Sequence, residues 1–132
     1  MPTPLQKKSY ELLIRTASAE IDLTGDWRVE AVLRRLFGAA TELGTWMERA
    51  TSAPSRAIFR DALHEIHACV RQVKLWVRVL DDLGRITPEA ASPLHDAAEE
   101  VHSLVVSALK TSAVSSISEA PDRRANGITT SV

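Results

Sequence analysis

Hydrophobic residues recur every three to four positions along most of this chain, and this spacing predicts α-helices. The short runs of alternating hydrophobic and polar residues that are typical of β-strands do not appear. Breaks that contain glycine, proline or serine divide the pattern into four segments. We expect helices over residues 4–22, 26–51, 54–84 and 88–112, the third being the longest.

Each predicted helix has a hydrophobic stripe that should face a common core. Long amphipathic helices joined by short loops pack as antiparallel neighbours. The sequence therefore predicts an all-α fold, an up-down-up-down antiparallel four-helix bundle. The core residues expected from the four segments in turn are Tyr10, Leu13, Ile14, Ala17 and Ile21; Val29, Val32, Leu33, Leu36, Ala40, Leu43, Met47 and Ala50; Phe59, Ala62, Ile66, Cys69, Val73, Trp76, Val77 and Leu80; and Leu94, Ala97, Ala98, Val101, Leu104, Val105, Ala108 and Leu109.

The breaks contain residues that end one helix and start the next. Gly25 can adopt the left-handed conformation that stops the first helix, and Asp26 can cap the second. The clearest boundary is the last one. There Gly84 can end the third helix, Thr87 can cap the fourth, and Pro88 suits its first position.

Two features of the C-terminal part affect its boundaries. Pro93 either kinks the fourth helix or, with Ser92, marks its true beginning. From Ala113 onward the chain is polar and rich in serine and threonine, a composition that cannot bury enough apolar surface to order itself. We therefore divide the chain into a four-helix bundle over residues 1–112 and a polar tail over residues 113–132.

Composition limits the class of protein. A chain of 132 residues suits one domain, and 45% hydrophobic residues is ordinary for a globular protein. The net charge of −1 gives no overall field that attracts nucleic acid or anionic membranes. One cysteine excludes an internal disulfide framework and fits a reducing compartment. Without a recognisable signal peptide or an apolar run long enough for a membrane span, we expect a cytoplasmic protein with no membrane partner.

Residues that could support catalysis or bind a metal lack the partners that such sites require. His64 and His67 share a helix face, but no set of Cys, Asp or Glu ligands stands at a matching spacing. Glu99 and His102 form a single Glu-x-x-His pair, whereas di-iron bundles need two. Cys69 lies on the core face, where a thiol is inert. We therefore expect no enzyme activity, no catalytic residues, no metal site and no cofactor.

The third segment carries a stripe of basic residues close to one line of its surface, at about 100° per residue. Residues 54–85 contain six basic and four acidic residues, a net charge of +2, whereas residues 86–112 have a net charge of −3. The stripe could follow nucleic-acid phosphates, or it could be solvated or pair with the acidic fourth helix of the same or a neighbouring subunit. The absence of a strong net positive charge favours the second interpretation. The stripe comprises Arg56, Arg60, Arg71, Lys74, Arg78 and Arg85, with His64 and His67 along it, and the candidate nucleic-acid contacts are Arg60, Arg71, Lys74 and Arg78.

Several large apolar residues fall at the edge of the predicted core stripes or outside them. Trp27 and Trp46 belong to the second segment, and Leu75 and Val79 to the third. Large apolar side chains outside a core stripe suggest a second buried surface. Self-association is the simplest explanation, and these four residues are our candidates for the oligomer interface.

Three stretches also resemble a known group of proteins. They are residues 59–66, residues 73–80 with the Leu75–Leu80 run, and residues 84–88, followed by an amphipathic last helix. Together they are similar to a family of bacterial four-helix-bundle proteins encoded by intervening sequences in large-subunit ribosomal RNA genes. That family also includes the accessory protein of diversity-generating retroelements, and the run that ends at Thr87 and Pro88 is closest to this branch.

The resemblance covers about residues 5–112 and implies an up-down-up-down bundle that assembles as a ring-like homopentamer. For the retroelement branch it also implies binding to nucleic acid and to a reverse transcriptase through basic surfaces. Two departures argue against that binding. Residues 41–48 lack the Pro, Asn and Glu-Gly step that the ribosomal members tend to carry, and retroelement accessory proteins are markedly basic, whereas this chain is not. We therefore expect an oligomer-forming protein first, and a nucleic-acid-binding accessory factor as the alternative.

Overall fold

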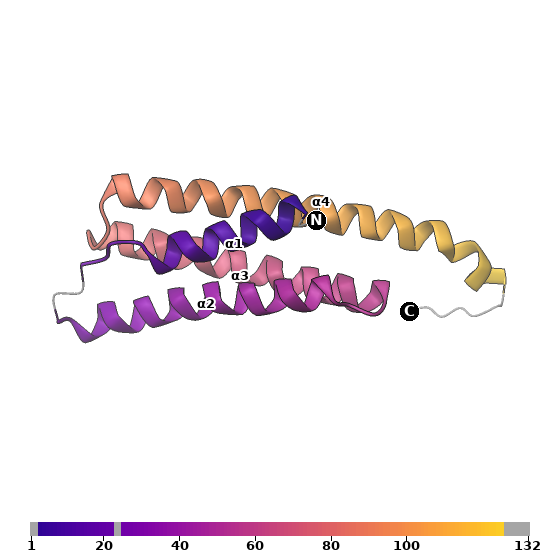
Figure 1. Cartoon of the computed structure of the whole chain (residues 1–132), viewed down its shortest axis with the longest axis horizontal. Helices are drawn as coiled ribbons and strands as arrows, with labels where there is room; N and C mark the ends of the chain where they lie inside the picture. The colour runs from indigo at the N-terminus through magenta and orange to yellow at the C-terminus, as the bar shows by residue number, and fades with distance from the viewer. Residues whose placement is uncertain (1–2, 23–24, 126–132) are drawn as a thin grey trace.

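The structure is a computed structural model that describes the backbone of residues 3–22 and 25–125, and the side chains of that set as far as residue 112. These residues form four helices and no strand: α1 (Pro4–Ala17), α2 (Trp27–Thr51), α3 (Arg56–Asp82) and α4 (Pro88–Ala125). Successive helices run in opposite directions alongside one another (Figure 1). The predicted all-α four-helix bundle is confirmed.

Packing between neighbouring helices closes the bundle. Both α1 and α3 pack against α2 and against α4, so the four helices surround one core. That core is aliphatic, as the stripes of α2, α3 and α4 predict, because hydrophobic burial is the main favourable term in folding. Its largest fully buried side chains are Leu12, Leu36, Leu43, Leu63, Ile66, Leu80, Leu94, Val70, Val73, Val77, Val101 and Val105.

The helix boundaries form through the capping groups that the sequence predicts. Asp26 Oδ1 accepts a hydrogen bond of 2.9 Å from the backbone N–H of Arg28, and Thr87 Oγ1 accepts one of 3.2 Å from that of Ala90. Gly25 and Gly84 have φ angles of 76° and 70°, the left-handed region that glycine enters without steric strain. The predicted caps at Asp26 and Thr87 and the stop at Gly84 are confirmed, whereas Gly25 does not stop the first helix, because α1 ends at Ala17 with Ser18 as its C-cap.

The first helix differs from its prediction in length and in orientation. It ends at Ala17 and not near Asp22, and the Ser18 hydroxyl donates a hydrogen bond to the Ile14 carbonyl at its end. Tyr10 and Ile14 are exposed at 66% and 47%, so their assignment to the core is wrong. The buried residues of α1 are Leu5, Ser9, Leu12 and Thr16.

The fourth helix is also longer than predicted. It begins at Pro88, so Pro93 lies inside it and the alternative start at Ser92 is wrong. It continues to Ala125, past the predicted end at Ser112, and its last turns extend beyond the other helices (Figure 1). With 38 residues, it and not α3 (27 residues) is the longest helix described. The division into bundle and tail stays a prediction, and residues 126–132 of that tail lie outside the described residues.

Candidate binding surfaces

A basic hollow lies on the surface between α3 and α4. Arg71, Lys74, Leu75 and Arg78 of α3 line it together with His95 and His102 of α4, and its volume is about 290 Å³. We call this set the basic hollow. Three of the four predicted nucleic-acid contacts lie in it, and so does Leu75, one of the predicted oligomer contacts. One of the four predicted oligomer contacts therefore lies beside the predicted nucleic-acid contacts.

The cations of the basic hollow are only partly neutralised within the chain. Lys74 Nζ lies 2.7 Å from Glu99 Oε1 of α4, and this ion pair lowers the pKa of the Glu99 carboxyl. Within the described part of the chain, neither Arg71 nor Arg78 makes a hydrogen bond or ion pair, and both side chains are exposed. Lys74 is thus paired with the acidic fourth helix, as the interpretation of the stripe as an intrachain partner expects. Arg71 and Arg78 are available to a ligand.

Two histidines meet at one end of this hollow. The rings of His67 on α3 and His102 on α4 pack edge to face, with centroids 5.0 Å apart and planes at 61°. Burial lowers the pKa of His67, and the neighbouring charge of His102, Arg71, His64 and Lys74 lowers it further. His102 Nδ1 is buried and has no hydrogen-bond partner among the described residues. The α3–α4 seam is therefore electropositive here and carries a polar atom that internal packing does not satisfy.

The six-residue basic stripe does not form one surface. Arg60 is half-buried, and its Nε atom is buried without a partner among the described residues. Arg85 follows the end of α3 and faces away into a different hollow, so its place in the stripe is wrong. Its guanidinium lies 3.7 Å from Asp22 and 3.9 Å from Asp26. The usable part of the stripe is the stretch from Arg71 to Arg78.

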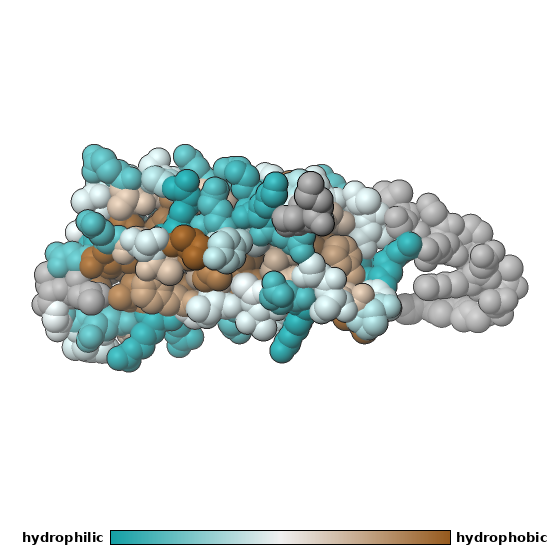
Figure 2. All heavy atoms as spheres, viewed as in Figure 1, coloured by the Kyte–Doolittle hydropathy of each residue, from teal (hydrophilic) through white to brown (hydrophobic). Residues whose placement is uncertain are grey.

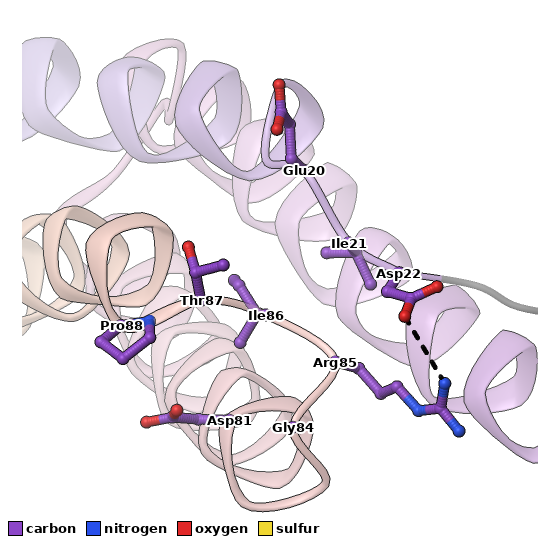
Figure 3. A pocket seen from close by; sticks show the side chains of 9 residues that line it. All are labelled: Glu20, Ile21, Asp22, Asp81, Gly84, Arg85, Ile86, Thr87 and Pro88. Carbon is purple, nitrogen blue, oxygen red and sulfur yellow. Dashed lines mark ion pairs between the residues drawn. The ribbon is translucent and has the colours of Figure 1, made fainter.

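Arg85 belongs to a larger hollow at one end of the bundle, where the α1–α2 and α3–α4 connections meet (Figure 3). The backbone N–H of Asp22 donates a 2.8 Å hydrogen bond to the Arg85 carbonyl, and the two side chains face each other. Ile86 beside them is buried in the core. These contacts hold the two connections together. A structural role therefore accounts for the residues of this hollow without a ligand.

The predicted oligomer contacts lie at several places on the bundle. Trp27 is 72% exposed at the start of α2, and Leu75 is 42% exposed in the basic hollow. Trp46 is half-buried between α2 and α3, with the Arg49 guanidinium 4.6 Å from its ring centroid. Val79 is half-buried on α3. The exposed apolar residues that sequence reasoning missed include Tyr10 and Ile14 of α1, which it assigned to the core.

The outward face of α1 is apolar in part. Tyr10 and Ile14 are exposed on it one turn apart, and Tyr10 and Leu13 border a hollow between α1 and α2 that also contains Gly44. A Cβ atom at Gly44 would stand 3.2 Å from Leu13 Cδ2, so glycine permits this close approach. Figure 2 shows hydrophobic side chains bordered by hydrophilic ones on the face where α1 lies.

Chemistry-bearing groups elsewhere do not converge. Burial raises the pKa of the Cys69 thiol to about 11, which suppresses the reactive thiolate. Within the described ranges, no group of three or more His, Cys, Asp or Glu side chains could hold a metal ion. In the same ranges no helix is both long and apolar enough to cross a bilayer.

Comparison with protein-family models, curated protein sequences and solved structures gives no match for this chain. The assignment of function therefore depends on the surfaces described above.

Proposed function

We propose that this chain is a non-enzymatic, cytosolic subunit of a homo-oligomer whose role depends on surfaces built by several copies. The observation that carries the proposal is the apolar face that α1 turns outward. Because Tyr10 and Ile14 stand one turn apart, both lie on one side of the helix. The opposite side of the same helix buries Leu5 and Leu12 in the core. A helix with apolar residues on two sides is typical of one that is covered on both.

A second copy of the chain is the occupant that we propose for this face. The exposed apolar residues extend beyond α1: Trp27 opens α2, and Leu83 caps α3 at the same end of the bundle. Exposed apolar area of this kind marks interaction surfaces in globular proteins. The resemblance to the intervening-sequence family supports five as the number of copies.

Light scattering on a sizing column tests the assembly. We expect the wild-type chain to elute with the mass of an oligomer, a homopentamer by the resemblance. Ile14→Glu should weaken association at least about tenfold, because a carboxylate would have to be buried in an apolar contact. Thr45→Glu is the matched control, since it adds the same residue at an exposed position of α2. A monomeric wild-type chain at micromolar concentration would contradict the proposal.

A second candidate function is binding to nucleic acid, alone or as an accessory factor of a reverse transcriptase. The stretch from Arg71 to Arg78 favours it, because both exposed guanidinium groups lie on the same side of α3 as Lys74. Seven residues of helix span about 10.5 Å, the length of roughly three phosphates along one strand. We therefore expect a short contact with nucleic acid.

A salt titration tests this second candidate. Three phosphate contacts on single-stranded RNA should give a slope of log K against log salt of about −2. Changing Arg71, Lys74 and Arg78 to Glu should abolish the binding. A wild-type chain that shows no RNA binding at about 50 mM salt, where phosphate contacts are strong, would exclude this function.

A further inference from the structure

The basic hollow has the composition of an anion site and not that of a solvated helix face. Five nitrogen-bearing side chains border it, three from α3 and two from α4. Glu99 is the carboxylate paired there with Lys74, and its side chain is 62% exposed. Since the whole chain has a net charge of −1, general basicity cannot explain this concentration of cations.

The scaffold around the hollow is rigid. On α3 the buried residues Val70, Val73 and Val77 alternate with the hollow's cations, and on α4 the buried residues Ala97, Ala98 and Val101 lie between its two histidines. Each cation thus stands on a helix segment that is fixed by core packing. Groups held in place before binding lose less conformational freedom when a ligand arrives.

The donors suit phosphate oxygens. Guanidinium groups offer planar pairs of N–H donors that match two oxygens of a phosphate, and Lys74 supplies a point charge. A histidine ring donates through at least one nitrogen in either protonation state, so His95 and His102 can both contribute.

The size of the hollow favours a small ligand over a long polymer. Its volume of about 290 Å³ lies at the lower end of the range for ligand cavities. Beyond it the basic stripe is interrupted, since Arg60 is half-buried and Arg85 is paired with Asp22 and Asp26. A long polyanion that follows α3 would contact these cations with only a few of its charges. A compact anion could contact all of the cations in the hollow.

We propose that the basic hollow between α3 and α4 binds a compact phosphate-bearing anion, held by Arg71, Lys74 and Arg78 with His95 and His102. The site lies within one chain, so it goes beyond the proposed self-assembly and does not require it. Leu75 forms the apolar part of its lining and would contact any uncharged portion of the ligand.

Calorimetric titration of the full chain with inorganic pyrophosphate, in about 50 mM salt, tests the site. We expect saturable binding with one pyrophosphate per chain. The double variant Arg71→Gln/Arg78→Gln should weaken it at least about tenfold, because hydrogen bonds to charged groups are among the stronger ones in proteins. Both side chains are exposed, so this variant should keep the wild-type circular dichroism and thermal midpoint.

The matched control is Arg34→Gln/Arg35→Gln. It removes the same two charges from exposed positions of α2, beside a hollow that contains Glu42 and Glu65. We expect pyrophosphate affinity within about twofold of wild type, since these two side chains line a different hollow, between α2 and α3. If both double variants lost the same pyrophosphate affinity, the loss would reflect the change in net charge and not a specific site. That result would overturn the proposal.

Two further results would also overturn it. One is the absence of saturable pyrophosphate binding to the wild-type chain. The other is binding of a short single-stranded RNA through Arg71 and Arg78 without binding of pyrophosphate, which would assign the hollow to a polymer. Light scattering on the same samples reports the oligomeric state separately, so failure of the anion site and failure of self-assembly are distinguishable.

Discussion

Two glycines show how the same residue type serves opposite purposes in this chain. Gly84 ends α3 with a φ of 70°, a conformation in which a Cβ atom would be strained. Gly38 lies inside α2 with helical geometry, and a Cβ atom there would have no heavy atom within 4 Å. Glycine is required at the first position and weakens the helix at the second.

Alanine at these two positions should therefore change stability in opposite directions. We expect Gly84→Ala to lower the free energy of unfolding by about 1–2 kcal/mol through left-handed strain. Gly38→Ala should raise it by about 0.5–1 kcal/mol, because alanine loses less backbone entropy in a helix. Urea unfolding at one fixed protein concentration measures both. A loss of stability in Gly38→Ala would show that α2 does not tolerate a methyl group on this side.

At the scale of elements, α1 shows where helical periodicity misleads. Tyr10 and Ile14 belong to an apolar stripe yet are exposed, whereas the bundle buries a face that contains Ser9 and Thr16 beside two leucines. The core accommodates Thr16 because its hydroxyl donates a 2.7 Å hydrogen bond to the Leu12 carbonyl. Periodicity indicates which faces are apolar, but it does not indicate which of them the chain's own helices cover.

The α3–α4 pair shows what could be predicted of the candidate site. The sequence indicates Arg71, Lys74 and Arg78 as one stripe and offers the acidic fourth helix as a possible partner, but it does not say which residues of the two helices meet. In an antiparallel pair that turns near residues 84–87, positions at equal distance from the turn lie opposite each other. That rule brings position 74 next to 99, as the Lys74–Glu99 ion pair shows, and it places His95 and His102 beside the two arginines.

For the whole molecule, the order of the helices determines how charge is distributed. Because α3 lies beside acidic α4, part of its positive charge is neutralised within the chain, as Lys74 is by Glu99. The pKa of the Glu99 carboxyl is lowered mainly by its hydrogen bond with Lys74, and that of Asp26 mainly by the Arg28 backbone N–H. The ordinary pKa values of these two carboxyl groups are 4.5 for Glu99 and 3.8 for Asp26. Because the folded chain lowers both, each group stabilises the fold at any pH above its ordinary pKa. That stability is lost as the pH falls through the lowered pKa.

Near neutral pH the titrating group of interest is His67. Its pKa lies below the ordinary value of 6.5, because it is partly buried and faces His102 of α4 as well as Arg71, Lys74 and His64 of its own helix. Between the lowered pKa of His67 in the folded chain and the ordinary value in the unfolded chain, the unfolded chain binds more protons. The free energy of unfolding should therefore fall as the pH drops below about 6.5. We expect the thermal midpoint of the wild-type chain to decrease between about pH 7.5 and pH 5.5, and His67→Gln to flatten this decrease. His64→Gln, which removes only one of the smaller causes of this lowered pKa, should keep most of the wild-type slope. An unchanged slope in His67→Gln would show that the contact between the two histidine rings does not make stability depend on pH.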